Sequence, residues 1–90
     1  MEQTNVEIIR EARIGKNGEW NLCFQLVNYL YGDGNKEKGY RFIWRRPDGT
    51  LQAARGQARI PSIADINYLI GQAIAEGWGN EIGDEGPLSY

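Results

Sequence analysis

Histidine is missing from this 90-residue chain, and cysteine occurs only once, at Cys23. Without histidine the chain has no serine–histidine or cysteine–histidine catalytic pair and no zinc site that uses histidine. A single cysteine allows neither an internal disulfide nor a four-cysteine zinc site, so a reducing cytoplasm is the expected location. Sequence spacing also identifies no pair of carboxylates suited to acid–base catalysis. We therefore expect neither an enzyme nor a protein that carries a metal or a cofactor.

Long apolar segments are missing as well. No run approaches the roughly 20 residues that a membrane helix needs, and residues 1–10, which include Glu2 and Glu7, lack the apolar region of a signal peptide. The composition, with 41% hydrophobic and 24% charged residues, is typical of a folded soluble protein. We predict one domain over residues 1–79, whose core alone is marginal for its size, and an acidic, glycine-rich flexible tail over 80–90.

Charge is distributed unevenly along the chain. Residues 60–90 contain five acidic residues and no lysine or arginine, whereas residues 36–59 contain seven basic residues and two acidic ones. A chain with a net charge of −2 can therefore still present a strongly basic surface. This asymmetry favours an anionic partner, although charges that cluster on a solvated surface without a ligand give the same pattern.

Alternation of apolar and polar residues predicts four strands, separated by turns that contain glycine. The expected strands are 6–14, 20–31, 40–46 and 51–60. A polar loop over 32–39 closes the hairpin between the second and third strands, and Pro47-Asp48-Gly49 forms the turn after the third. The more apolar face of the second strand, expected to face the core, comprises Trp20, Leu22, Phe24, Leu26, Asn28 and Leu30.

The periodicity becomes helical after Ser62. We predict a helix over 62–76, capped by Ser62 with Asp65 in the capping-box position. Gly77 is expected to end it with a positive φ, and Trp78 to fold back on the last turn. Its apolar stripe comprises Ile63, Ile66, Ile70, Ala73, Ile74 and Gly77. The predicted fold class is α+β, a four-stranded antiparallel sheet followed by one C-terminal helix on one face of the sheet.

Five arginines lie on the two predicted strands that flank the Pro-Asp-Gly turn. They are Arg41, Arg45 and Arg46 before the turn, and Arg55 and Arg59 after it. A hairpin would place the two sets side by side. Guanidinium groups pair with phosphates and the neighbouring aromatic rings offer a stacking surface for bases, so this composition suits single-stranded nucleic acid. The alternative is a solvated strand face without a ligand.

Strand alternation leaves the role of Trp44 open. One face of its strand holds Arg41, Ile43 and Arg45, and the other holds Tyr40, Phe42, Trp44 and Arg46. Phe42 and Trp44 therefore either pack in the core or contact a ligand. Cys23, in the middle of a strand with apolar neighbours, is expected to be a buried, unreactive thiol.

The same part of the chain resembles the positive cofactor four family of transcriptional coactivators. The resemblance is carried by the stretch RFIWRRPDGTL over 41–51 and continues to Arg55, Ile60 and Ser62. The shared pattern is an arginine, two residues, a tryptophan and a Pro-acid-Gly turn, followed by a basic strand and a helix cap. The bacterial YdbC-like branch of that family is resembled in the segment VEII at 6–9 and in Tyr40, Pro47 and Asp48.

The resemblance implies that the four-stranded sheet is curved and that the chain forms a homodimer, joined largely through the C-terminal helix. Dimerisation would add buried area to a small core. It also implies that single-stranded DNA lies across the open sheet faces, with the family's contacts carried over onto Arg41, Trp44 and Arg55. Charge and position add further candidates, namely Arg45, Arg46, Arg59, Lys36 and Lys38, with Tyr40 assisting Trp44 in stacking.

We therefore expect sequence-tolerant binding of single-stranded DNA, with a role in transcription or in replication and repair. RNA stays an alternative ligand, because stacking and phosphate contacts do not depend on the sugar. The alternative function is a protein-interaction module that uses the basic sheet face or an exposed edge strand. One departure weakens the expected grip on phosphate: the family tends to use lysine, proline and glycine at the positions held here by Gln52, Ala53, Ala54 and Gln57.

Overall fold

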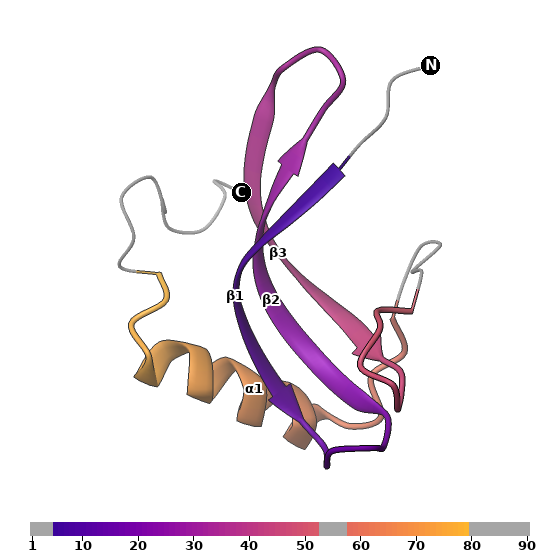
Figure 1. The fold of residues 1–90 in the computed structure, drawn as a ribbon. Coiled ribbons are helices and arrows are strands. Elements are labelled where there is room, and N and C mark those ends of the chain that lie inside the picture. Colours follow the sequence, from indigo (N-terminus) through magenta and orange to yellow (C-terminus); the bar gives the residue numbers. More distant parts are fainter. Residues whose placement is uncertain (1–4, 53–57, 80–90) are drawn as a thin grey trace.

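The chain folds as an open antiparallel sheet with one helix across it, as the computed structural model in Figure 1 shows. The structure describes residues 5–52 and 58–79, so Arg55 and the predicted tail over 80–90 lie outside the described residues. The strands are β1 (Asn5–Ile14), β2 (Asn21–Leu30) and β3 (Lys36–Arg45), and the helix is α1 (Ile63–Ala75). The strands lie in the order β1-β2-β3, and the sheet bends strongly along its length. Within the described part of the chain, no helix has the length and apolar character needed to cross a membrane.

The first two predicted strands are confirmed to within one residue, but β3 begins four residues earlier than predicted. The reason is a tight turn between β2 and β3. The Tyr31 N–H donates to the Asn35 carbonyl at 2.9 Å, and the Gly34 N–H donates to the Tyr31 carbonyl at 3.0 Å. Because this turn closes the hairpin within five residues, Lys36 and Lys38 lie on a strand and not in the predicted loop.

The prediction of a fourth strand over 51–60 is corrected by the structure. Among the described residues of this segment, Leu51 forms an isolated bridge to Arg45, and the Gln52 N–H donates to the Trp44 carbonyl at 2.9 Å. The carbonyl of Arg59 instead accepts a hydrogen bond from the Trp44 indole at 2.8 Å, and Pro61 has no N–H to offer to a ladder. The sheet of the described residues therefore has three strands, and residues 53–57 lie outside the described part.

The turn after β3 forms as predicted. The Gly49 N–H donates to the Arg46 carbonyl at 2.8 Å, and Gly49 has a φ of 87°, which favours glycine. The Asp48 carboxylate accepts hydrogen bonds from the Thr50 hydroxyl at 2.6 Å and the Thr50 N–H at 2.9 Å. These two bonds lower the pKa of Asp48, so its charge is held within its own turn.

Both ends of α1 are formed by the predicted residues. The Ser62 hydroxyl accepts from the Asp65 N–H at 3.2 Å, and the Asp65 carboxylate accepts from the same hydroxyl at 3.0 Å. At the other end Gly77, with a φ of 84°, donates to the Ile74 carbonyl, and Trp78 donates to the Ala73 carbonyl. This pair of bonds is a Schellman motif, and it turns the Trp78 side chain back into the core.

The core lies between α1 and the face of the sheet that α1 covers. It consists of Ala12, Leu22, Leu26, Leu69, Ala73 and Trp78, with Ile14, Phe24, Phe42, Trp44 and Ile60 packed against it. The predicted helix stripe is wrong in part, because α1 buries Leu69 and Ala73 while Ile63 and Ile74 are 75% and 67% exposed. The apolar surface of α1 is wider than the sheet can cover, so part of it faces outward.

Candidate functional site

The register of β2 and β3 separates the candidate arginines from the candidate aromatics. Arg41 pairs with Gln25 and Arg45 with Asn21 on the face of the sheet opposite α1, which we call the open face. Trp44 instead pairs with Leu22 on the face that α1 covers. There it packs against the core, with its indole N–H donating to the Arg59 carbonyl. Trp44 therefore lies on the helix side of the sheet, partly buried against the core.

The open face has an apolar floor beneath a charged layer. Cys23 and Val27 are fully buried in this floor, and Ile43 is 4% exposed. Burial raises the pKa of the Cys23 thiol to about 11, and the nearby Glu11 carboxylate adds to the effect. Cys23 is thus the buried thiol that the sequence predicts, protonated at neutral pH and out of reach of reagents.

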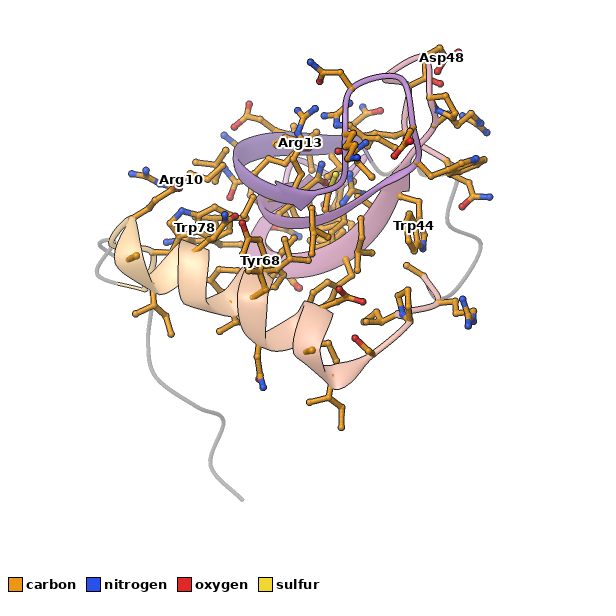
Figure 2. The ribbon with its side chains drawn as sticks, turned by 90° about the horizontal axis from the view of Figure 1, so that it is seen from below. Arg10, Arg13, Trp44, Asp48, Tyr68 and Trp78 are labelled. Carbon is orange, nitrogen blue, oxygen red and sulfur yellow. The ribbon has the colours of Figure 1, made fainter. Side chains whose placement is uncertain are left out.

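Glu11 of β1 lies at the centre of the charged layer. The Nε and Nη2 atoms of Arg45 donate to its carboxylate at 3.1 and 2.8 Å, and Arg13 Nη2 lies 2.6 Å from Glu11 Oε2. The Gln25 amide also donates to it, at 2.5 Å, and in turn accepts from Arg41 Nε at 2.8 Å. One connected network thus joins three guanidinium groups from β1 and β3. Figure 2 shows Arg13 on the side of the sheet away from α1, whereas Trp78 lies beside the helix.

The charge of this network is positive. Burial raises the pKa of Glu11, but the hydrogen bonds from Arg45 and Gln25 and the charges of Arg45 and Arg13 outweigh it, so the pKa is lower than usual. The hydrogen bond to Glu11 raises the pKa of Arg45. Glu11 is therefore ionised at neutral pH, and one carboxylate faces the guanidinium groups of Arg13, Arg41 and Arg45, which leaves two positive charges in excess.

An aromatic residue that was not among the predicted site residues lies on the open face. Tyr29 follows Gln25 and Val27 on the same face of β2. A Cβ built at Gly39 of β3 would lie 3.3 Å from Tyr29 Cε2, so the ring lies over this glycine. The alternation of β2 was the available signal, since it places Tyr29 and Gln25 on one face of the strand.

The other predicted site residues lie elsewhere. Lys36 and Lys38 alternate with Tyr40 and Trp44 along β3, on the helix side of the sheet. Arg46 belongs to the turn, where its Nη1 donates to the Leu51 carbonyl at 2.6 Å. The structure therefore brings together Arg41 and Arg45 of the predicted set. It adds Arg13, which was not predicted because it lies outside the basic segment 36–59.

A second surface, of different character, lies at the C-terminal end of α1. The rings of Phe24 and Tyr40 stack with centroids 5.6 Å apart, and Trp78 stacks on Phe24 at the same distance. Together with Ile70 and Ile74 they line an apolar hollow of about 190 Å³. This hollow continues onto the exposed apolar side of the helix.

Neither surface offers a metal site. Over residues 5–52 and 58–79, no group of three or more histidine, cysteine, aspartate or glutamate side chains is arranged to hold a metal ion. A function is inferred from two surfaces: the open face, which holds the positive arginine network and, opposite Tyr29, the carboxylate of Glu37, and the apolar hollow. Comparison of the chain with protein-family models, with curated proteins and with solved structures finds no match.

Proposed function

We propose that the protein binds single-stranded nucleic acid, with DNA as the first candidate, across the open face of its sheet. The observation that supports this most is the array of Arg13, Arg41 and Arg45, which outnumber the one carboxylate, Glu11, to which they are linked. Guanidinium groups bind phosphate oxygens through paired N–H donors, and such bonds are about twice as strong as neutral ones. The resemblance of residues 41–51 to a family of single-strand binders supports the same proposal.

The proposed contacts differ in part from those expected from the sequence. Arg41 and Arg45 are four residues apart on β3, or about 13 Å, so they reach different phosphates of one strand. Tyr29 supplies the ring on which a base stacks, a contact that contributes about 1–3 kcal/mol per base. Trp44, partly buried against the core, and Tyr40, which stacks on Phe24, lie on the other side of the sheet.

We also propose that the protein is a homodimer joined through α1. Ile63, Ile70 and Ile74 are exposed by 75%, 36% and 67%, on a helix whose other side forms the core. Monomeric proteins seldom expose a contiguous apolar patch of this kind. A second copy of α1, packed on this side and over the hollow beside Trp78, would bury it and add to a small core.

The test of the binding proposal is fluorescence anisotropy with a labelled oligo-dT strand. We expect binding that an unlabelled duplex of equal length competes for poorly. The plot of log K against log salt concentration should have a slope of about −2, from three phosphate contacts at about −0.7 each. Absence of binding at low salt, or equal competition by the duplex, contradicts the proposal.

A pair of variants locates the binding surface. Arg41→Ala should weaken binding to all sequences and flatten the salt slope by about 0.7, the value for one phosphate contact. Lys38→Ala, on the same strand but the other face, removes the same charge and should leave the slope unchanged. A larger effect of Lys38→Ala would move the interface to the helix side of the sheet.

A protein partner is the alternative, and the apolar hollow is the observation that favours it. In that case the hollow and the outer side of α1 receive an apolar segment of another protein. Ile74→Asp would then abolish binding of the partner. Neither the wild type nor this variant would change the anisotropy of the labelled oligonucleotide, because neither would bind it.

A further inference from the structure

We infer that Gln25 and Glu11 are positioning residues of the open face, which hold Arg41 and Arg45 in fixed orientations for the phosphates of a bound strand. This inference rests on the proposed function and adds two residues to it. Neither residue is basic or aromatic. Gln25 is a neutral amide, and Glu11 has the same negative charge as the ligand. Their part lies in their hydrogen bonds to the arginines.

Gln25 is an unusual residue for the face of a sheet that no helix covers. It is fully buried, and both ends of its amide are occupied: Nε2 donates to Glu11, and Oε1 accepts from Arg41 Nε. An ionised carboxylate only accepts hydrogen bonds. Glu11 therefore orients the amide with its nitrogen toward β1 and its oxygen toward Arg41. Through this amide of β2, Glu11 of β1 also fixes the position of the Arg41 side chain on β3.

Glu11 fixes Arg45 more directly. The Nε of Arg45 lies 3.1 Å from both carboxylate oxygens, and Nη2 lies 2.8 Å from Oε1. On the far side of the guanidinium, Nη1 donates to the Gly49 carbonyl at 2.7 Å. Arg45 is thus held from two sides, by β1 and by the turn after β3.

Such anchoring affects affinity because an arginine side chain loses conformational freedom when it binds. Fixing a rotamer-rich side chain in advance removes an entropic cost that corresponds to about two- to tenfold in Kd per side chain. Since Gln25 is fully buried, a bound strand cannot touch it. Any effect of Gln25 on affinity must therefore pass through the residues to which it is bonded.

The experiment compares oligo-dT binding by the wild type and by Gln25→Met, which keeps the side-chain length and the charge of the protein. We expect the Kd to rise about two- to tenfold and the salt slope to stay the same, because no phosphate contact is lost. In an Arg41→Ala background the same change should have a smaller effect, since one anchored side chain is gone and Gln25 then acts only through Glu11 and Arg45. Asn28→Leu is the matched control: it removes an amide of β2 that donates to Glu7 on the other face, at 3.3 Å.

Glu11→Gln provides a second variant if Gln25→Met fails to give the wild-type circular dichroism spectrum. It removes one negative charge from the open face, so a carboxylate that only repels the ligand predicts tighter binding. Positioning by Glu11 predicts weaker binding, most clearly at high salt, where the electrostatic attraction is screened. Glu7→Gln, four residues earlier on β1 and on the other face, makes the same charge change and should bind like the wild type.

The outcomes separate this inference from the proposed function. A folded Gln25→Met protein that binds like the wild type, or a Glu11→Gln protein that binds more tightly, overturns the positioning role and leaves the binding proposal intact. A loss from Gln25→Met that is as large in the Arg41→Ala background as in the wild type assigns Gln25 a general structural role and also overturns the inference. A wild type that does not bind oligo-dT overturns both.

Discussion

Replacing Leu69 by alanine tests how α1 is attached to the sheet. Leu69 is fully buried, and Ala73 is the other buried residue of α1. Leucine-to-alanine changes at fully buried sites cost about 3–5 kcal/mol, from lost transfer free energy and from the cavity left behind. A domain of this length has a free energy of unfolding of about 5–13 kcal/mol. A loss of about 3 kcal/mol should lower the Tm by about 12–24 °C.

The matched control for Leu69→Ala is Ile74→Ala. Ile74 lies on the same helix but is 67% exposed, so the change removes about one third of the burial energy of an isoleucine, or less than about 1 kcal/mol. Urea unfolding followed by circular dichroism measures both losses, over a range of protein concentrations to separate the contribution of a dimer. The Leu69→Ala loss should not depend on concentration. Equal losses at low concentration, or a larger loss for Ile74→Ala, would refute the packing described here and favour the helix stripe predicted from the sequence.

Two further predictions concern stability. Burial raises the pKa of Glu11, but its hydrogen bonds with Arg45 and Gln25 lower it below the ordinary value of about 4.5. Glu11 therefore stabilises the fold above that pH, and this contribution is lost as the pH falls through the folded-state pKa. In a plot of the free energy of unfolding against pH, Glu11→Gln should reduce the fall in stability on the acid side. Parallel curves for the wild type and the variant would contradict this. Trp44→Phe should cost about 0.5–1.5 kcal/mol, the net contribution of one hydrogen bond, because the indole N–H that donates to the exposed Arg59 carbonyl is lost. The salt slope of oligo-dT binding should stay unchanged. A strong loss of binding in a stable protein would return Trp44 to the interface.

Much of the fold is predictable because its signals are local. The alternation in β1 and β2, the Pro-Asp-Gly turn, and the Ser62 and Gly77 caps of α1 each depend on a few neighbouring residues. The start of β3 was missed because a turn of five residues replaced the expected loop of eight. The buried side of α1 was predicted wrongly because Leu69 and Ile70 are adjacent in sequence and equally apolar. Only the position of the sheet decides which of them is buried.

The candidate site is harder to predict from the sequence than the fold, because its contacts are not local. Alternation alone places Arg41 and Arg45 on one face of β3. The contacts that define the site, however, join residues far apart in sequence: Glu11 and Arg45 are separated by 34 positions, and Gln25 and Arg41 by 16. Such pairs follow from the strand register, which no local pattern specifies. The position of Trp44 against the core likewise involves a hydrogen bond to a carbonyl 15 residues away.

The most direct test of the proposed interface is a titration of the ¹⁵N-labelled protein with oligo-dT, followed by NMR. If the strand lies across the open face, the largest shifts should occur in the arginine Nε–H signals of Arg13, Arg41 and Arg45 and in the amide of Tyr29. The indole N–H signal of Trp44, on the other side of the sheet, should stay in place. Shifts that instead concentrate at Trp44, Lys36 and Lys38, with the arginine signals unchanged, would contradict an interface on the open face.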